Sequence, residues 1–196
     1  MKRAHLGDSI DFWKRGLIGY LRTAAIIERI EVAPVTTDAR AWTSVELEAY
    51  ATILGVSVAD LLGTGRFTQS GRTPYFNSLM VTTDVFVDPD TGVTEPATTA
   101  AHVSALECGR LLVRDPPNIV MVYQHAQRNN DWAKRQLEVV RKALPGVQTF
   151  AYQSSVVGML FLSWDAVRLQ KVRSALSDLL GPAASGLNDF PARIVL

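Results

Sequence analysis

Residues 81–92, Val81-Thr-Thr-Asp-Val-Phe-Val-Asp-Pro-Asp-Thr-Gly92, decide the fold class because they join a β-strand to an abrupt polar turn. Val81 to Val87 is rich in β-branched and aromatic residues, whereas Asp88 to Gly92 has the composition of a turn. A second run, Ile119 to Tyr123, is apolar throughout, which is typical of a strand covered on both faces. The two runs predict central, parallel, neighbouring strands.

Helix and strand patterns alternate around these two strands, which predicts a sheet with helices on both faces. We expect helices from Asp8 or Ser9 to Ala24, from the capping box Thr43–Glu46 to Gly55, from Ser57 to Gly63, over 99–112, over 131–144 and from Asp165. We expect strands over 29–35 and 192–196, and a hairpin formed by 147–152 with 156–163. Residues 63–78 are predicted to form a loop. The prediction is a single α/β domain, 1–196, of three-layer Rossmann-like architecture. Its sheet is expected to be mostly parallel with an antiparallel edge hairpin, and residues 39–78 to form a helical excursion beside the site.

Composition excludes several classes of protein. Of the 196 residues, 47% are hydrophobic and 20% charged, unlike a disordered chain, and a single cysteine, Cys108, excludes a disulfide scaffold. There is no apolar run of the roughly 20 residues that span a bilayer, and no apolar signal segment near the start. We therefore expect a cytoplasmic protein without a membrane partner.

Charge is unevenly distributed along the chain. Residues 1–29 carry six basic and three acidic groups, residues 30–109 three and ten, and residues 110–196 eleven and six. Basic ends that meet in the fold would form a face able to bind RNA or DNA. Ordinary solvated helix faces would give the same counts.

Polar residues follow both central strands, at the edge where α/β sheets bind ligands. Asp88 and Asp90 leave the first strand, and His125, followed by Arg128, leaves the second. At the start of the first helix, Asp11 and Lys14 lie one turn apart and can pair. We expect Asp88 to be an accessible carboxylate within one side-chain length of this helix, in one cleft with His125. The alternative is that Asp88 and Asp90 only form a turn.

Four segments resemble a known family, in order along the chain. Gly7-Asp-Ser-Ile-Asp-Phe-Trp-Lys14 is similar to the GNxADVxKH opening of the 23S ribosomal RNA adenine-N6 methyltransferases. Val85-Phe-Val-Asp-Pro89 resembles their fourth strand and the first half of its DPPY motif, Ile119–Tyr123 the next strand, and Val157–Leu162 the late GM strand. The opening GDxxDFxK and the later DPDxG also resemble a group of bacterial proteins without an assigned activity.

The resemblance implies a methyltransferase-like fold and a nucleic-acid-modifying enzyme that uses S-adenosylmethionine. Asp88 would accept a hydrogen bond from the substrate amine. The implied site residues are Asp88, Asp11, Lys14 and His125 for catalysis, and Asp8, Asp38, Asp90 and Gly92 for the cofactor. The place of the family's glycine-rich cofactor turn holds residues 33–38, Ala-Pro-Val-Thr-Thr-Asp, without glycine.

Two other functions remain open at this point. In the first, Asp8, Asp88 and Asp90 hold Mg²⁺ in a nuclease or phosphodiesterase, since carboxylate oxygens are the ligands that Mg²⁺ prefers. In the second, the chain is a non-catalytic binding protein that kept the fold and lost the cofactor site.

Overall fold

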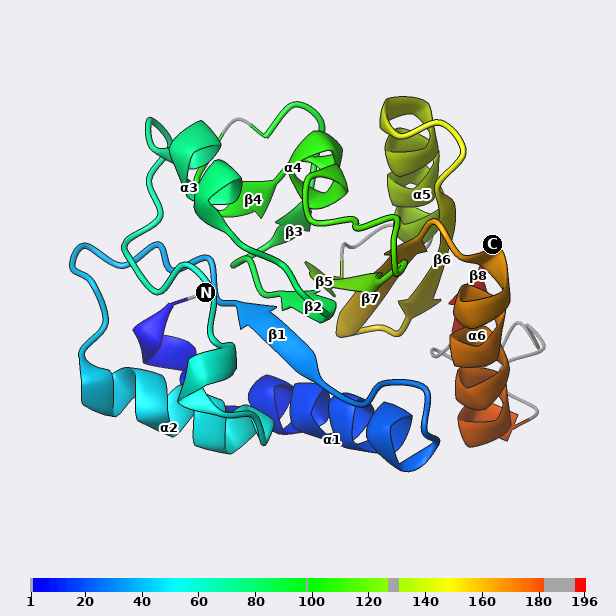
Figure 1. Cartoon of the computed structure of the whole chain (residues 1–196), viewed down its shortest axis with the longest axis horizontal. Helices are drawn as coiled ribbons and strands as arrows, with labels where there is room; N and C mark the ends of the chain where they lie inside the picture. Colours follow the sequence, from blue (N-terminus) through cyan, green and yellow to red (C-terminus); the bar gives the residue numbers. More distant parts are fainter. Residues whose placement is uncertain (1, 98, 127–130, 182–192) are drawn as a thin grey trace.

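The structure, a computed structural model, describes residues 2–97, 99–126, 131–181 and 193–196. Its helices and strands alternate along the chain (Figure 1). The α-helices are α1 Ser9–Thr23, α2 Ser44–Leu54, α3 Arg72–Ser78, α4 Ala105–Gly109, α5 Trp132–Ala143 and α6 Ala166–Leu180, and η1 Arg3–His5 and η2 Val58–Asp60 are 3-10 helices. The strands are β1 Ile30–Ala33, β2 Asp84–Val87, β3 Gly92–Val93, β4 His102–Val103, β5 Ile119–His125, β6 Gln148–Gln153, β7 Val157–Ser163 and β8 Arg193–Val195.

The main sheet is mixed, and this corrects the expectation of a mostly parallel one. Its strand order is β1-β2-β5-β7-β6-β8. β1, β2 and β5 are parallel, as predicted for the two central strands, with Val85 opposite Val120. The remaining pairs, β5 with β7, β7 with β6 and β6 with β8, are antiparallel. The predicted hairpin of β6 and β7 is present, but β7 lies inside the sheet beside β5, and β8 forms the edge.

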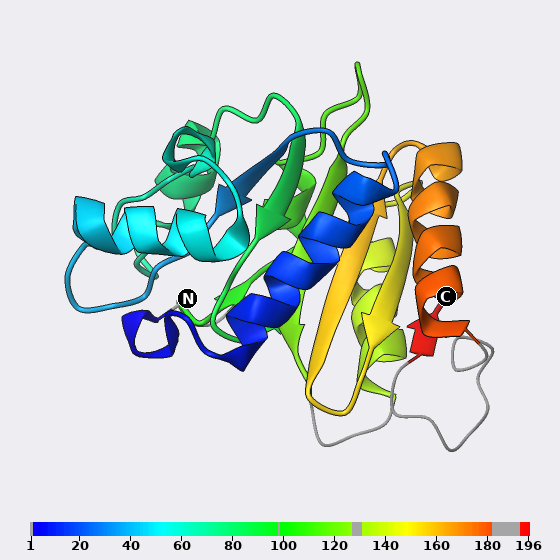
Figure 2. The same cartoon turned by 90° about the horizontal axis from the view of Figure 1, so that it is seen from below.

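The sheet separates two helical layers, so the three-layer α/β arrangement is confirmed. Figure 2 shows α1 crossing one face of the sheet with α6 beside it, while α5 lies behind. Phe86 and Met121 belong to the core on the α1 side, and Val85 and Val122 to the core on the α5 side. Because successive side chains of a strand point to opposite faces, the apolar runs of β2 and β5 fill both cores.

Short polar signals explain where most helices begin. Asp8, Thr43 and Asp165 cap α1, α2 and α6 with their side chains, as their sequence patterns predict.

Two expectations were wrong. The helix expected over 99–112 is only α4, because β4 precedes it and Ser104 caps it; the loop expected over 63–78 contains α3. Arg72 starts α3 and is held by a buried ion pair with Glu107, a long-range contact that local sequence does not reveal.

Within the described ranges, no helix has the length and apolar character required to cross a membrane.

The packing of β7 against α5 depends on a glycine. A Cβ built on Gly158 would lie 2.0 Å from the Trp132 ring and 3.0 Å from the Tyr152 carbonyl oxygen. We expect Gly158→Ala to lower the free energy of unfolding by about 1–3 kcal/mol, the usual cost of overpacking. Urea unfolding followed by circular dichroism measures this. The control is Gly16→Ala in α1, which meets nothing within 4 Å and should stabilise the helix by about 0.5–1 kcal/mol. An unchanged Gly158→Ala variant would contradict the packing described here.

Candidate functional site

A cavity lies at the carboxyl ends of β2 and β5, where the start of α1 meets the sheet. Its volume is about 160 Å³. It is lined by Lys2, His5, Asp8, Ile10, Asp11, Lys14, Asp88, Pro89, Asp90, Tyr123 and His125. We call this cavity the strand-end cleft. The expected shared cleft of Asp88, the first helix and His125 is therefore present.

The start of α1 is shaped by three residues. Gly7 has a φ of 81°, a conformation that favours glycine, and its N–H donates to Asp11 Oδ2 at 2.9 Å. Asp8 Oδ1 accepts from the N–H groups of Ile10 and Asp11 at 2.8 and 3.1 Å. Asp8 is thus occupied as a helix cap, and Asp11 is fixed at the edge of the cleft.

Lys14 joins Asp11 to Asp88 inside the protein. Its Nζ lies 2.9 Å from Asp11 Oδ1 and 2.9 Å from Asp88 Oδ2, and the three side chains are at most 3% exposed. Tyr50 of α2 donates to the same Asp88 Oδ2 at 2.6 Å. Asp88 was expected to be accessible, and it is fully buried instead. The reason is the period of two in a strand: Asp88 follows Phe86 on the face that α1 covers.

Burial and charge shift the pKa values of this cluster in a consistent pattern. Burial opposes the charged form of Lys14, but attraction by Asp88 and then Asp11 outweighs it and raises the pKa to about 12. For Asp11, burial outweighs the attraction of Lys14, and its pKa is raised. Burial and then Asp88 raise the pKa of Tyr50, which keeps it a neutral hydrogen-bond donor. Lys14 is therefore a fixed ammonium ion and a poor nucleophile.

Among the described residues that line the cleft, one buried polar side-chain atom has no partner. Asp88 Oδ1 is buried and accepts no hydrogen bond from any part of the chain that the structure describes. An unpaired buried acceptor costs about 1–3 kcal/mol, and more when charged. Such atoms in native proteins call for an explanation, and a bound ligand is one.

β5 supplies the opposite wall of the cleft. The ring of Tyr123 lies under Lys14 Nζ, 4.6 Å from the ring centroid, and its hydroxyl is 3.0 Å from His125 Nδ1. His125 itself is exposed at the mouth. On the β2 side, Asp90 accepts a hydrogen bond from the Thr37 hydroxyl. Arg128, expected near His125, lies outside the described residues.

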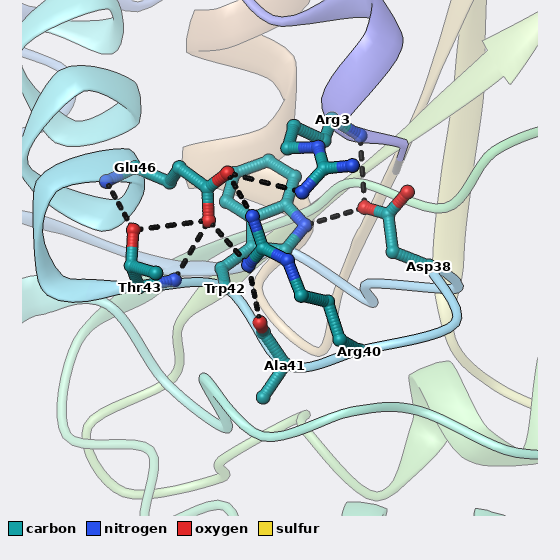
Figure 3. A network of polar contacts seen from close by, with 7 residues as sticks. All are labelled: Arg3, Asp38, Arg40, Ala41, Trp42, Thr43 and Glu46. Atoms are coloured by element: carbon teal, nitrogen blue, oxygen red, sulfur yellow. Dashed lines mark hydrogen bonds and ion pairs between the residues drawn. The ribbon is translucent and has the colours of Figure 1, made fainter.

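Two residues predicted to bind a cofactor lie outside the lining. Asp38 accepts from the backbone N–H of Arg3 at 2.9 Å and from Trp42 Nε1 at 2.6 Å. Figure 3 shows this contact beside a second one, in which Glu46 pairs with Arg3 and Arg40. Gly92 packs on Gln124, whose side-chain oxygen would lie 2.2 Å from an added Cβ. Asp38 ties the amino-terminal segment to the loop before α2, Gly92 permits close packing, and neither residue contributes to the strand-end cleft.

The residues after β1 do not fit S-adenosylmethionine. The resemblance places the cofactor at this turn, but residues 33–36 are buried by the segment that follows η2. Leu62 N–H donates to the Val32 carbonyl at 2.7 Å, and Phe67 N–H to the Thr36 carbonyl at 2.8 Å. The protein's own backbone therefore packs against this turn, on the side where the family's cofactor would lie.

The arrangement of carboxylates also argues against the proposed Mg²⁺ site. Of the proposed ligands Asp8, Asp88 and Asp90, Asp88 is already paired with the ammonium group of Lys14, 2.9 Å from its Oδ2. Asp8 is used as a helix cap. Across the ranges listed above, no three His, Cys, Asp or Glu side chains are grouped so as to hold a metal ion.

A larger groove of about 690 Å³ lies between the end of α1 and α6. Its lining includes Ala24, Ala25, Ala166 and Val167. It adjoins a hollow that contains Asp84, at the opposite end of β2 from Asp88. Ligands of such sheets bind at the carboxyl ends of the strands, so the smaller strand-end cleft is the candidate site.

Sequence reasoning missed Tyr50. Its hydroxyl is one of the two donors to Asp88, yet it lies in a helix among apolar residues and looks like a core residue. The available signal was chemical, because a buried tyrosine usually needs a partner for its hydroxyl.

Removing Lys14 should destabilise the fold in a pH-dependent way. We expect Lys14→Met to cost about 3–5 kcal/mol at pH 7, because two buried carboxylates lose their cation. The cost should be smaller at pH 4.5. The pKa of Asp11 is raised in the folded state, so lowering the pH protonates the carboxyl and relieves the repulsion. Urea unfolding at both pH values measures the difference.

The control for Lys14→Met is Arg15→Met, at an exposed position of the same helix, which should change stability by about 0.5 kcal/mol or less. An equal cost of Lys14→Met at pH 7 and pH 4.5 would contradict the charge balance described for the cluster.

Comparisons with models of protein families, with curated proteins and with solved structures found no match. The function of the strand-end cleft must therefore be inferred from its own residues.

Proposed function

We propose that this chain is a binding protein whose strand-end cleft receives a small molecule, or one end of a larger one, that donates a hydrogen bond to Asp88 Oδ1. The observation that carries the proposal is this buried oxygen without a partner, in a cavity of about 160 Å³. Of the functions compatible with the sequence, this one requires neither S-adenosylmethionine nor Mg²⁺, the two groups that the residues do not fit.

The partner of Asp88 must be a donor. An ionised carboxylate only accepts hydrogen bonds, and Oδ2 already receives Lys14 and Tyr50. Both donors come from helices, α1 and α2, that pack on the same face of the sheet. They hold the carboxylate through Oδ2, and Oδ1 has no partner. A preorganised acceptor of this kind favours binding because little side-chain freedom is lost when the ligand arrives.

The size of the cleft limits what enters it. Sites for drug-sized molecules commonly have about 300–1,000 Å³, whereas this cavity has about 160 Å³. A group of a few heavy atoms fits, such as an amine with a short carbon chain or the edge of a heterocycle. A complete nucleoside cofactor is too large.

A second candidate is recognition of a nucleobase amine, which would make the chain a nucleic-acid-modifying protein. One observation favours it: the three late segments that carry the methyltransferase resemblance form the adjacent strands β2, β5 and β7, and Asp88 follows the first of them. Asp88 would then accept a hydrogen bond from the exocyclic amine. Because S-adenosylmethionine does not fit after β1, no methyl transfer is derived for this candidate.

The first proposal predicts a specific effect of Asp88→Asn. This change keeps the shape, removes the negative charge and leaves Lys14 paired with Asp11, so we expect the fold to persist. Titrations of the ¹⁵N-labelled chain with methylguanidinium, N-methylurea and 9-methyladenine should show binding of at least one probe at the cleft. Losing a hydrogen bond to a charged group, worth about 1.5–3 kcal/mol, should weaken that binding about tenfold or more.

The matched control is Asp84→Asn. Asp84 is another buried carboxylate on β2, paired with Arg168 at the opposite end of the strand. It should lose stability without losing binding. If none of the three probes shifts cleft resonances, or if both variants bind equally well, the proposed function is wrong.

The second candidate predicts salt-dependent binding to RNA or DNA. Duplex binding should weaken between 50 and 200 mM salt with a log–log slope of about 0.9 per neutralised phosphate. Fluorescence anisotropy with labelled oligonucleotides measures this. Absence of binding at 50 mM salt would eliminate the candidate and leave the small-ligand proposal intact.

A further inference from the structure

We infer that the group bound by Asp88 is a cation, namely a guanidinium or primary ammonium group carried by a small organic molecule. This inference rests on the proposed function, since it specifies the chemical class of the ligand in the same cleft. Two independent observations carry it: the charge balance of the buried cluster, and the unpartnered Asp88 Oδ1.

The buried part of the cleft has an excess of negative charge. Asp11 and Asp88 are 1% and 0% exposed, and the cation between them, Lys14, is 3% exposed. When both carboxylates are ionised, they share one ammonium group, which leaves one negative charge uncompensated. Tyr50 contributes a dipole and no charge, because its pKa is raised. An uncompensated buried charge is costly, and native proteins neutralise it with a partner or with a proton.

Among the described residues of the lining, Lys14 is the one buried basic side chain. The remaining charged residues of the lining are Lys2 with Asp8 and Asp90, and the histidines are His5 and His125. Lys2 and His5 are exposed, and His5 Nδ1 lies 3.9 Å from Asp8. The described part of the rim therefore offers Asp88 no second buried ammonium or guanidinium group.

The free acceptor lies where the excess charge is. Lys14 and Tyr50 both bind Asp88 Oδ2, so Oδ1 carries charge without a donor. A cationic N–H donor at Oδ1 would satisfy the acceptor and neutralise the cluster in one step. A neutral donor would satisfy the acceptor only. Both kinds of donor make a charge-assisted hydrogen bond to an ionised carboxylate, but only a cation also gains Coulomb attraction to the negative cluster. The cleft should therefore prefer the cation.

Methylguanidinium and N-methylurea test this directly, because they share size, planarity and N–H donors and differ in charge. We expect chemical-shift titrations of the full chain, at matched chloride concentration, to give at least about tenfold tighter binding of methylguanidinium. Asp88→Asn should weaken binding of both probes about tenfold or more, and Asp84→Asn should preserve it.

Asp11→Asn separates charge from hydrogen bonding. It leaves Asp88 Oδ1 in place and makes the buried cluster neutral, since Lys14 then balances Asp88 alone. We expect this variant to lose most of the preference for methylguanidinium while N-methylurea still binds. This readout does not depend on the stability of Asp88→Asn.

The outcomes distinguish the two proposals. Equal affinities for methylguanidinium and N-methylurea, or tight binding of 9-methyladenine alone, would contradict the inference that the ligand is a cation. The proposed function would still stand. A preference for methylguanidinium that persists unchanged in Asp11→Asn would also overturn the charge argument. No binding of any probe would overturn both proposals.

Discussion

The contact of Lys14 with Asp11 and Asp88 is the interaction on which the candidate site depends. It joins the first turns of α1 to the end of β2, two elements that are 74 residues apart in the chain. Ion pairs at the surface contribute little to stability, but removing one member of a buried pair is expensive because the other charge stays in a medium that solvates it poorly. The cluster therefore fixes where the amino-terminal helix crosses the sheet, and with it the position of the strand-end cleft.

The same contact limits the chemistry of the cleft. With its pKa raised to about 12, Lys14 stays charged at neutral pH, and it already neutralises Asp88, one of the three carboxylates proposed to hold a divalent metal. The turn after β1, where a cofactor would lie in the family that the sequence resembles, is covered by the backbone of residues 61–67. What remains, among the described residues of the cleft, is a buried cluster in which Asp88 Oδ1 has no hydrogen-bond partner. These properties favour recognition of a small cation over group transfer.

Mixed strand directions follow from the chain after β5. Helix α5 returns the chain to the end of the sheet at which β5 begins. β6 therefore runs parallel to β5, and one strand lies between them. The tight turn after β6 brings β7 back into that gap, antiparallel to both neighbours. The continuous burial of β7, from Val157 to Ser163, is the result of this central position. A hairpin at the edge of the sheet would have one less neighbour and a more exposed outer strand.

Local sequence determined the elements whose signals are local. The apolar runs of β2 and β5, the caps of α1, α2 and α6, and the polar residues at the strand ends were all readable, because hydrophobic periodicity and capping depend on residues within one or two turns. The approach of Asp11, Lys14 and His125 to Asp88 was also predictable, since the ends of parallel strands meet at one edge. Tertiary structure decided the rest. It placed β7 inside the sheet and α3 in a loop-like sequence whose first helical residue, Arg72, pairs with Glu107. It also brought Tyr50 to Asp88 and buried Asp88. Each of these depends on residues distant in the chain, and their burial and pairing have no periodicity that a single sequence displays.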